Sequence, residues 1–320
     1  MRAESLLQLL QSVREQTLYP NEILIIDGST NSETRIVLEE NTFKNLTYFL
    51  VPKEYRGLTR QRNYGVDKAS ETSDMIAFVD DDTELTPNYF EELVRTFVAD
   101  KTIFGVGGVA LNENSWVLAE PNKQYNKYHF FQFDKFVYKE GQRNVVRNYL
   151  RLQSNLEPGK MPDYSHGRTC GFPLDGKIYK VDLLIGMSFA FRKIVFDSIQ
   201  FSSYFEGYGL YEDADFSIRA LQFGSNVINT KVQLNHYHDT SGRPNQYQYG
   251  KMVVRNGWYV WRTKNRKPSF DAKMKWHSIT ILLTLIRFSN IFTTKKRKEA
   301  FTEAFGRTVG WWSLFFNAPK

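Results

Sequence analysis

The sequence predicts an α/β fold in which a mostly parallel sheet is flanked by helices. Two observations predict it. Short apolar runs rich in β-branched residues alternate with segments of helical spacing from residue 4 to about 110, and this alternation is typical of parallel sheets covered by helices. Apolar residues also make up 42% of the 320-residue chain, which is enough for a sizeable core.

The individual elements follow from local spacing. Four apolar residues, Leu6, Leu9, Leu10 and Val13, recur at helical intervals, and residues 23–26 form an apolar run of the kind found in buried strands. The helices are predicted at 4–16, near 32–40, 60–69 and 88–99, and the strands at 22–26, 46–51, 75–79 and 103–109. The pattern opens on a helix, so either the strand that usually starts such a sheet is absent or the true start of the protein lies upstream, which is the interpretation we favour.

The rest of the chain follows other patterns. Residues 112–180 are rich in Tyr, Phe and basic residues without clean periodicity, which indicates an insertion that we expect to lie over the site. From about residue 251 the pattern is helical, and one apolar face is formed by Phe301, Phe305, Val309, Trp312 and Phe316. The sequence therefore predicts an α/β domain over 1–250 and a helical extension over 251–320.

Charge is divided unevenly along the chain. The net charge is +7, but residues 251–320 hold fifteen Lys and Arg against three Asp and Glu, so residues 1–250 are net acidic. A nucleic-acid-binding protein with a uniformly basic surface would not show this division. The pattern indicates an acidic body that binds metal and substrate, with a basic tail.

Targeting features favour a cytoplasmic location. The single cysteine, Cys170, excludes an internal disulfide framework and suits a reducing compartment. The first residues include Glu4 and have no continuous apolar core, which argues against a secretory signal. The best apolar run, residues 279–286, is far shorter than the roughly 20 residues that a bilayer requires.

Three adjacent carboxylates, Asp80, Asp81 and Asp82, directly follow the predicted strand at 75–79. Like charges in such proximity resist joint ionisation, and a divalent cation is the usual remedy. Oxygen ligands suit hard ions such as Mg²⁺ or Mn²⁺, and a metal there would neutralise a departing diphosphate. The alternative is an acidic turn that leads into a helix N-terminus, where Asp is also favoured. The triplet alone does not separate the two.

Asp27 ends a second predicted strand, at 22–26. Ligands of open α/β sheets bind outside the carboxyl ends of strands, so we expect Asp27 and the Asp80–Asp82 cluster at the same edge. Between them, the segment from Gly57 to Gly65 places Arg60 and Arg62 at a loop-to-helix junction, where backbone N–H groups and guanidinium groups could hold a phosphate. Surface helices commonly carry Arg, so this segment is weak evidence by itself.

A second acidic cluster consists of Glu212 and Asp213, with Asp215 two residues later. It follows the glycine-punctuated stretch at 205–209 and begins a helical pattern. Carboxylates at this position can simply favour a helix N-terminus. A carboxylate at the mouth of a site also suits a general base for an acceptor hydroxyl.

In this order the motifs resemble glycosyltransferase family 2, the inverting enzymes with the GT-A fold. The resemblance covers residues 4 to about 240 and rests on Ile26-Asp27-Gly28-Ser29, on Gly57 to Gly65, on Asp80-Asp81-Asp82, on Gly186 to Arg192, and on Glu212-Asp213 with Asp215. It implies a Rossmann-like GT-A catalytic domain over 1–250. Its nucleotide-sugar half spans about 1–110, the insertion about 112–180 and the acceptor half about 181–250.

On the donor side, the resemblance implies roles for five residues. Asp27 would contact the nucleotide base, and Arg62 would lie near the base or the phosphates. Asp80 would touch the nucleoside, with Asp81 also in the donor site, and Asp82 would bind the metal.

On the acceptor side, the resemblance implies that Asp213 deprotonates the acceptor hydroxyl, with Glu212 in support. Gly186, Met187 and Ser188 would form part of the acceptor-side floor. The acceptor oxygen would attack the anomeric carbon as the metal-bound diphosphate leaves, with inversion of configuration.

The chain departs from the family pattern in two places. The opening strand and the loop that helps to hold the nucleotide base are missing. Ile26 also stands where the family often has a second Asp before Asp27, which removes a polar contact but keeps the strand apolar.

His236 and His238 form a His-x-His pair at the end of what looks like a strand. Some relatives supply a metal-binding histidine in this region, and imidazole suits Mn²⁺ better than Mg²⁺. The alternative is a pair of surface or hydrogen-bonded histidines. His236 is the candidate metal ligand of the two.

The sequence therefore predicts an inverting glycosyltransferase that moves a sugar from a nucleoside-diphosphate sugar to a saccharide or lipid-linked acceptor, in surface polysaccharide biosynthesis. One alternative is nucleotidyl transfer to a sugar phosphate, which typically needs a glycine-rich phosphate loop near the N-terminus. The other is an inactive glycan-binding relative.

The basic tail also allows two interpretations. Lys295-Lys296-Arg297-Lys298, next to an aromatic helix, favours peripheral contact with an anionic membrane, which would be the inner face of the cell membrane. Alternatively, the apolar face packs on the catalytic domain while the charges are solvated. Nucleic acid is not expected as a partner.

Overall fold

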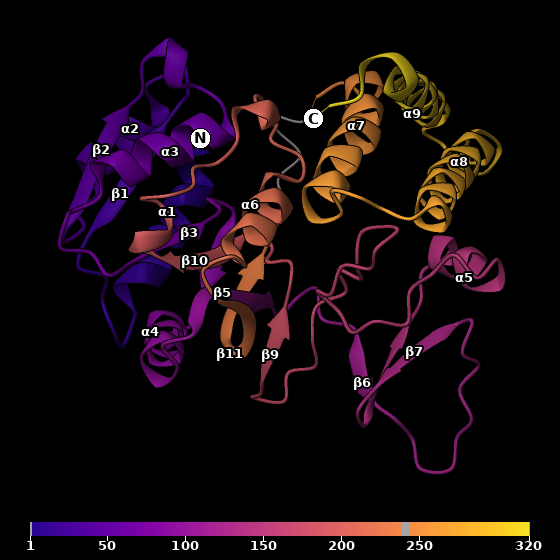
Figure 1. Cartoon of the computed structure of the whole chain (residues 1–320). Helices are drawn as coiled ribbons and strands as arrows, with labels where there is room; N and C mark the ends of the chain where they lie inside the picture. Colours follow the sequence, from indigo (N-terminus) through magenta and orange to yellow (C-terminus); the bar gives the residue numbers. More distant parts are fainter. Residues whose placement is uncertain (1, 239–243, 320) are drawn as a thin grey trace. The chain divides into compact units, whose positions relative to one another are not determined.

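A computed structural model describes residues 2–238 and 244–319 (Figure 1). The chain divides into two compact units, one formed by residues 1–114 and 174–241 and the other by residues 115–173 and 242–320. The sequence prediction counted 112–180 as an insertion of the catalytic domain. The structure groups most of this segment with the C-terminal helices, because Trp261 and Lys264 donate hydrogen bonds to the carbonyl oxygens of Asp163 and Met161.

The first unit alternates helices and strands, as the sequence predicts. Its N-terminal part contains α1 (Ala3–Arg14), β1 (Ile23–Asp27), α2 (Glu33–Glu40), β2 (Leu46–Leu50), α3 (Leu58–Lys68), β3 (Met75–Val79), β4 (Thr83–Leu85), α4 (Tyr89–Ala99) and β5 (Ile103–Ala110). Its later part contains β9 (Ile178–Val181), β10 (Ser188–Arg192), α6 (Glu212–Ala220) and β11 (Ser225–His236). The eight helices and strands predicted within residues 1–110 are confirmed to within two residues at each end.

The main sheet is mixed, so the prediction of a mostly parallel sheet is wrong in this detail. Its strand order is β3-β10-β5-β11-β4, with β9 also paired to β11. The pair β5–β11 is parallel, whereas β10 runs antiparallel to both of its neighbours and β4 runs antiparallel to β11. Apolar periodicity identifies a strand but not its direction, which explains the difference.

Strands β1 and β2 form a separate parallel pair. In the part of the chain that the structure describes, no strand connects this pair to β3.

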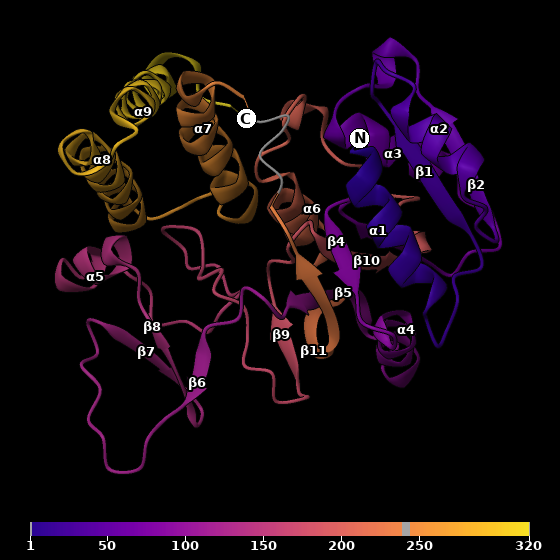
Figure 2. The same ribbon diagram turned by 180° about the vertical axis from the view of Figure 1, so that it is seen from behind.

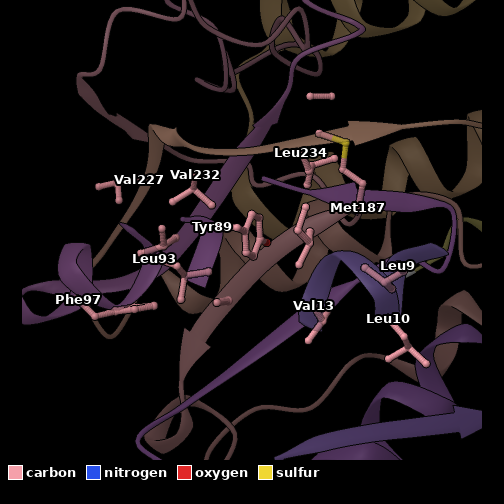
Figure 3. Packing of buried hydrophobic residues seen from close by; sticks show 14 of the residues in the cluster. Leu9, Leu10, Val13, Tyr89, Leu93, Phe97, Met187, Val227, Val232 and Leu234 are labelled. Atoms are coloured by element: carbon pink, nitrogen blue, oxygen red, sulfur yellow. The ribbon is translucent and has the colours of Figure 1, made fainter. Parts of the chain in front are cut away.

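Helices α1 and α4 cover one face of the main sheet (Figure 2). Leu9, Leu10 and Val13 of α1 belong to the same buried cluster as Tyr89 and Phe97 of α4 (Figure 3). Because side chains alternate along a strand, β10 serves both faces. Ser188 shares a hydrogen bond with Tyr89 on the α4 side, whereas Phe191 packs on Phe216 of α6. Strand β10 is therefore buried on both faces, and it lies next to β3, the strand that the Asp80–Asp82 cluster follows.

The second unit combines a small sheet with helices. It contains the antiparallel strands β6 (Trp116–Leu118), β7 (Phe130–Phe133) and β8 (Phe136–Lys139), and the helices α5 (Gln142–Tyr149), α7 (Gln246–Lys264), α8 (Phe270–Thr293) and α9 (Arg297–Asn317). Gly306 of α9 approaches α7 so closely that an added Cβ would overlap the Tyr247 carbonyl oxygen. Among the described helices, none combines the length and the apolar character that crossing a membrane requires.

Candidate active site

The Asp80–Asp82 cluster occupies a short loop between β3 and β4. The antiparallel pairing of β3 with β10 continues just beyond the strand, because the Asp80 N–H donates to the Met187 carbonyl at 3.2 Å. The Thr83 hydroxyl donates to the Asp80 carbonyl at 2.8 Å and tightens the turn. The loop therefore presents its carboxylates at the end of the strand, as predicted. The expectation that this strand is buried is wrong, because β3 lies at the edge of the sheet and its residues are partly or fully exposed.

Strand β4, which the sequence did not predict, brings His236 to the same loop. Its antiparallel register with β11 places His236 opposite Thr83, and the Tyr237 N–H donates to the Asp82 carbonyl at 3.0 Å. The Nε2 atom of His236 lies 3.5 Å from Oδ1 of Asp82. One potential ligand atom from each of Asp80, Asp82 and His236 falls within 4.8 Å of the others. Carboxylate oxygens suit hard divalent ions and an imidazole nitrogen suits transition metals, so a group of two carboxylates and one imidazole fits Mn²⁺.

Arg2 already provides positive charge in this cluster. Its guanidinium group pairs with Asp81 and, at 2.8 Å, with Oδ2 of Asp82, and its backbone N–H donates to Asp81 at 3.1 Å. The sequence prediction missed this contact, because Arg2 lies about 80 residues away and shows no motif. A bound cationic side chain shows that the cluster stabilises positive charge at Asp82.

The pKa values of Asp80 and His236 are both shifted by their surroundings. Desolvation by the surrounding protein raises the pKa of Asp80 to about 6; Arg62 opposes the rise and Asp82 adds to it. His236 is also perturbed. Although partial burial favours its neutral form, the carboxylates of Asp82 and Glu113 outweigh that effect and raise the pKa of His236.

Arg62 connects the metal-binding candidates to the second acidic cluster. Its buried guanidinium group pairs with Glu212, and one of its nitrogens lies 3.7 Å from Oδ1 of Asp80. The guanidinium carbon also lies 4.9 Å from the centre of the Phe189 ring and 5.3 Å from that of Phe201. Aromatic faces and two carboxylates thus fix the position of this arginine.

Glu212 and Asp213 occupy the first turn of α6. Tyr211, the residue before them, has a left-handed backbone with φ 73°, which is costly for a bulky residue and is often found at functional sites. Burial raises the pKa of Glu212 to about 8, with Asp213 adding to the rise and Arg62 opposing it. Desolvation also raises the pKa of Asp213, even though two backbone N–H groups favour its carboxylate form.

The carboxylate of Asp213 is held in a defined orientation. Its Oδ2 accepts from the Gly186 N–H at 2.9 Å and its Oδ1 from the Ala214 N–H at 2.7 Å. An added Cβ at Gly186 would lie 3.2 Å from Arg62 and 3.3 Å from Glu212, so the glycine permits this close approach. A carboxylate with a raised pKa and a fixed orientation can act as a general base.

The other two residues predicted for the acceptor side point elsewhere. Met187 is buried in the hydrophobic cluster beneath α1 and α4 (Figure 3), and Ser188 is buried with its hydroxyl bonded to Tyr89. The acceptor role of Gly186, Met187 and Ser188 stays a prediction. Gly186 is the member that adjoins the other candidate residues.

Asp27 lies at the end of β1, as predicted. It is fully buried; its Oδ1 accepts from the Ser29 backbone and hydroxyl, and its Oδ2 from the Tyr48 hydroxyl at 2.9 Å. Burial pushes the pKa of Asp27 upward, but these hydrogen bonds outweigh it and hold the pKa below its usual value. Contact between Asp27 and a nucleotide base stays a prediction.

Comparisons with known proteins concern the family and the fold. Residues 1–157 match the family described as "Glycosyl transferase family 2". The chain is 24% identical over 234 residues to the putative glycosyltransferase EpsH of Bacillus subtilis, covering 71% of this chain and 55% of that protein. It is 36% identical over 110 residues to the hyaluronan synthase of Streptococcus pyogenes, covering 33% of this chain and 26% of that protein. The chain thus spans about half or less of these relatives.

A solved structure supports the fold. The mannosyltransferase PcManGT from Pyrobaculum calidifontis, in complex with GDP-Man and Mn²⁺, matches with a TM-score of 0.50 and 12% identity, covering 99% of this chain and 85% of that one. At this identity the likeness shows the fold alone. The predicted fold class, an α/β fold of the GT-A type with C-terminal helices, is confirmed.

Proposed function

Because the match over residues 1–157 shows that the chain belongs to glycosyl transferase family 2, we propose that it transfers a sugar from a nucleoside-diphosphate sugar to a hydroxyl acceptor. One observation carries the proposal. Contacts through Arg62 join the metal-binding candidates Asp80, Asp82 and His236 to the general-base candidate Asp213 and its neighbour Glu212. A donor site and an acceptor site need this kind of proximity.

On the donor side, Asp82 and His236, with Asp80 beside them, would hold a divalent metal ion, Mn²⁺ in preference to Mg²⁺. When bound, such an ion supplies positive charge that stabilises a departing diphosphate. The complex of the similar mannosyltransferase with GDP-Man and Mn²⁺ supports this choice. Asp27, Arg62, Asp80 and Asp81 are proposed to contact the donor.

On the acceptor side, the Asp213 carboxylate accepts the proton of the acceptor hydroxyl. The acceptor oxygen forms a bond to the anomeric carbon while the bond from that carbon to the diphosphate oxygen breaks, and the electron pair leaves with the diphosphate. A direct displacement of this kind inverts the configuration. Glu212 assists by fixing Arg62 beside the base, and the Gly186 N–H holds the carboxylate in place.

Product analysis tests the proposal. The protein is mixed with a panel of nucleotide sugars and saccharide acceptors, with and without Mn²⁺, and the released phosphate species are identified. A Mn²⁺-dependent nucleoside diphosphate is the expected product. Pyrophosphate from a nucleoside triphosphate and a sugar phosphate would establish nucleotidyl transfer instead. If Mn²⁺ promotes neither turnover nor binding of any nucleoside diphosphate, the chain is an inactive glycan-binding relative.

The acceptor class follows from a weaker argument. The sequence similarity to a hyaluronan synthase supports a growing saccharide as the acceptor, free or linked to a lipid, in the synthesis of a surface polysaccharide. A lipid-linked acceptor would require the enzyme to work at a membrane surface, on its cytoplasmic side.

The surface of α9 fits such a location. Its buried positions are mostly small residues, among them Ala300, Ala304 and Gly310, whereas Trp312 and Phe316 are exposed. Phe301, Phe305 and Phe315 are exposed as well, and the basic run at 295–298 lies at the start of the helix. A helix with exposed aromatic rings next to lysine and arginine suits contact with an anionic bilayer.

Vesicle binding checks this contact. We expect the protein to co-sediment with vesicles that contain phosphatidylglycerol and to bind phosphatidylcholine vesicles much less. The double variant Lys295→Ala, Lys296→Ala should weaken binding to the anionic vesicles roughly 30-fold at low salt, since each basic residue near the surface contributes about 1 kcal/mol. Lys101→Ala with Lys135→Ala removes the same charge elsewhere and serves as the control. Equal binding by both double variants would rule out the basic run as the contact.

A further inference from the structure

A short segment after β5 is fastened to the end of β11. The Leu111 N–H donates to the Leu234 carbonyl at 2.8 Å. The Asn112 side chain then bonds the backbone of His236 twice, donating to its carbonyl at 2.8 Å and accepting from its N–H at 3.0 Å. These bonds fix the next residue, Glu113, beside the His236 ring.

Glu113 and Asp82 face opposite nitrogens of the same imidazole. Oε1 of Glu113 lies 2.8 Å from Nδ1 of His236, whereas Oδ1 of Asp82 lies 3.5 Å from Nε2. A carboxylate can only accept a hydrogen bond, so the closer contact favours a proton on Nδ1. In a neutral ring, the lone pair then resides on Nε2, the nitrogen that faces Asp82.

We propose that Glu113 is a positioning residue that holds His236 in the Nδ1-protonated tautomer, so that Nε2 is available to a divalent metal. The proposal rests on the metal site of the proposed function. A carboxylate behind a ligating histidine fixes the orientation of the ring and raises its basicity, and losing such a partner typically weakens metal binding 10–100-fold. The segment fastened by Asn112 thus connects the end of β5 to the metal site.

His238 is the competing partner of this carboxylate. Its Nε2 lies 2.8 Å from the same Oε1 of Glu113, and its ring centre is 4.1 Å from that of His236. Glu113, His236 and His238 could therefore hold a cation of their own. However, that arrangement would use Nδ1 of His236, whereas the positioning role leaves Nδ1 protonated. The two arrangements differ in their dependence on His238.

Metal affinity provides the first test. Mn²⁺ binding is measured by electron paramagnetic resonance without nucleotide, for the wild type and for Glu113→Ala, and the affinity of the variant should fall 10–100-fold. Glu113→Gln keeps an acceptor oxygen but loses the charge, so its Mn²⁺ affinity should lie between those of the wild type and Glu113→Ala. Glu84→Ala is the matched control, because Glu84 lies on neighbouring β4, accepts from the Tyr237 hydroxyl at 2.6 Å, and carries the same charge. Thermal unfolding confirms that each variant is folded.

The tautomer provides a second readout. Nitrogen NMR of the metal-free protein, at a pH that leaves the ring neutral, should show His236 protonated on Nδ1, and Glu113→Ala should lose this preference. A wild-type ring protonated mainly on Nε2 would overturn the proposal.

The remaining outcomes separate this proposal from the proposed function. If the wild type binds Mn²⁺ and Glu113→Ala binds it equally well, the positioning role is wrong while the metal site stands. If the wild type binds no Mn²⁺, both fail. If His238→Ala weakens binding as much as Glu113→Ala does, the cation is held by Glu113, His236 and His238 themselves, and the positioning role is again wrong.

Discussion

Asp213→Asn is expected to lower kcat by about 10²–10⁴-fold, the range that a general base contributes. An amide cannot accept the proton of the acceptor hydroxyl at the moment of attack. The fold should tolerate the change, because Asn has nearly the same shape as Asp. Its single side-chain oxygen can keep one of the two hydrogen bonds that the carboxylate now accepts from the Gly186 and Ala214 N–H groups. Initial rates with a nucleotide sugar and its acceptor, at saturating concentrations, give the comparison.

Two controls make the result specific to the base. Binding of a nucleoside diphosphate should change little, since Asp213 is proposed to act on the acceptor. Glu212→Gln loses a carboxylate one residue away, and its effect should be smaller than that of Asp213→Asn because Glu212 supports Arg62 rather than receiving the proton. A purified Asp213→Asn protein with full activity would refute the assignment of the base.

Asp82→Asn is expected to have the second large effect, on metal binding as well as on turnover. Asp82 is buried, and each of its oxygens faces a different nitrogen-containing group, Nε2 of His236 and the guanidinium of Arg2. Replacing this carboxylate by a neutral amide removes the negative charge that would attract and bind the divalent ion. Mn²⁺ affinity should fall by more than the 10–100-fold that loss of a supporting partner costs, and Mn²⁺-dependent nucleotide binding should fall with it.

Asp81→Asn is the matched control for Asp82→Asn. It removes the same charge from the neighbouring residue and also weakens the pairing with Arg2, but Asp81 is outside the group formed by Asp80, Asp82 and His236. Its Mn²⁺ affinity should not fall, and it should rise to the extent that weaker pairing of Arg2 frees Asp82. Calorimetric titration of both variants measures the difference, and similar losses in the two would mean that the cluster acts only through its total charge.

Much of the first unit is predictable from local sequence. The strand at 75–79 is an apolar run that ends directly in three Asp residues, and Asp27 ends another run in the same way, so both positions follow from the pattern alone. The order of the motifs then indicates the family, which the match over residues 1–157 confirms. Chemistry placed directly at the end of a strand is visible in sequence, because the strand itself is.

The contacts that organise the site are not visible in this way. Arg2 and Asp82 are 80 positions apart, and Glu113 and His236 are 123 apart, and no spacing rule relates them. The second pair depends on where β11 ends beside β5, because Leu111 and Asn112 bond Leu234 and His236. The three-residue strand β4 in turn sets where β11 meets the acidic loop. A strand so short carries too few residues to show a period of two. The approach of His236 to Asp82 therefore could not be derived from local spacing, and it was expected only from the family resemblance.

The pairing of Arg2 with the acidic loop determines what a metal titration would measure. A divalent ion that binds Oδ2 of Asp82 must take the place of the guanidinium, so binding through this oxygen is an exchange of one cation for another rather than simple addition. The observed affinity for the metal is then the intrinsic affinity reduced by the competing affinity for Arg2. The observed Kd equals the intrinsic Kd divided by the fraction of molecules in which Arg2 has moved away from Asp82. For this protein, the strength of the metal site is therefore set partly by a residue that never touches the metal.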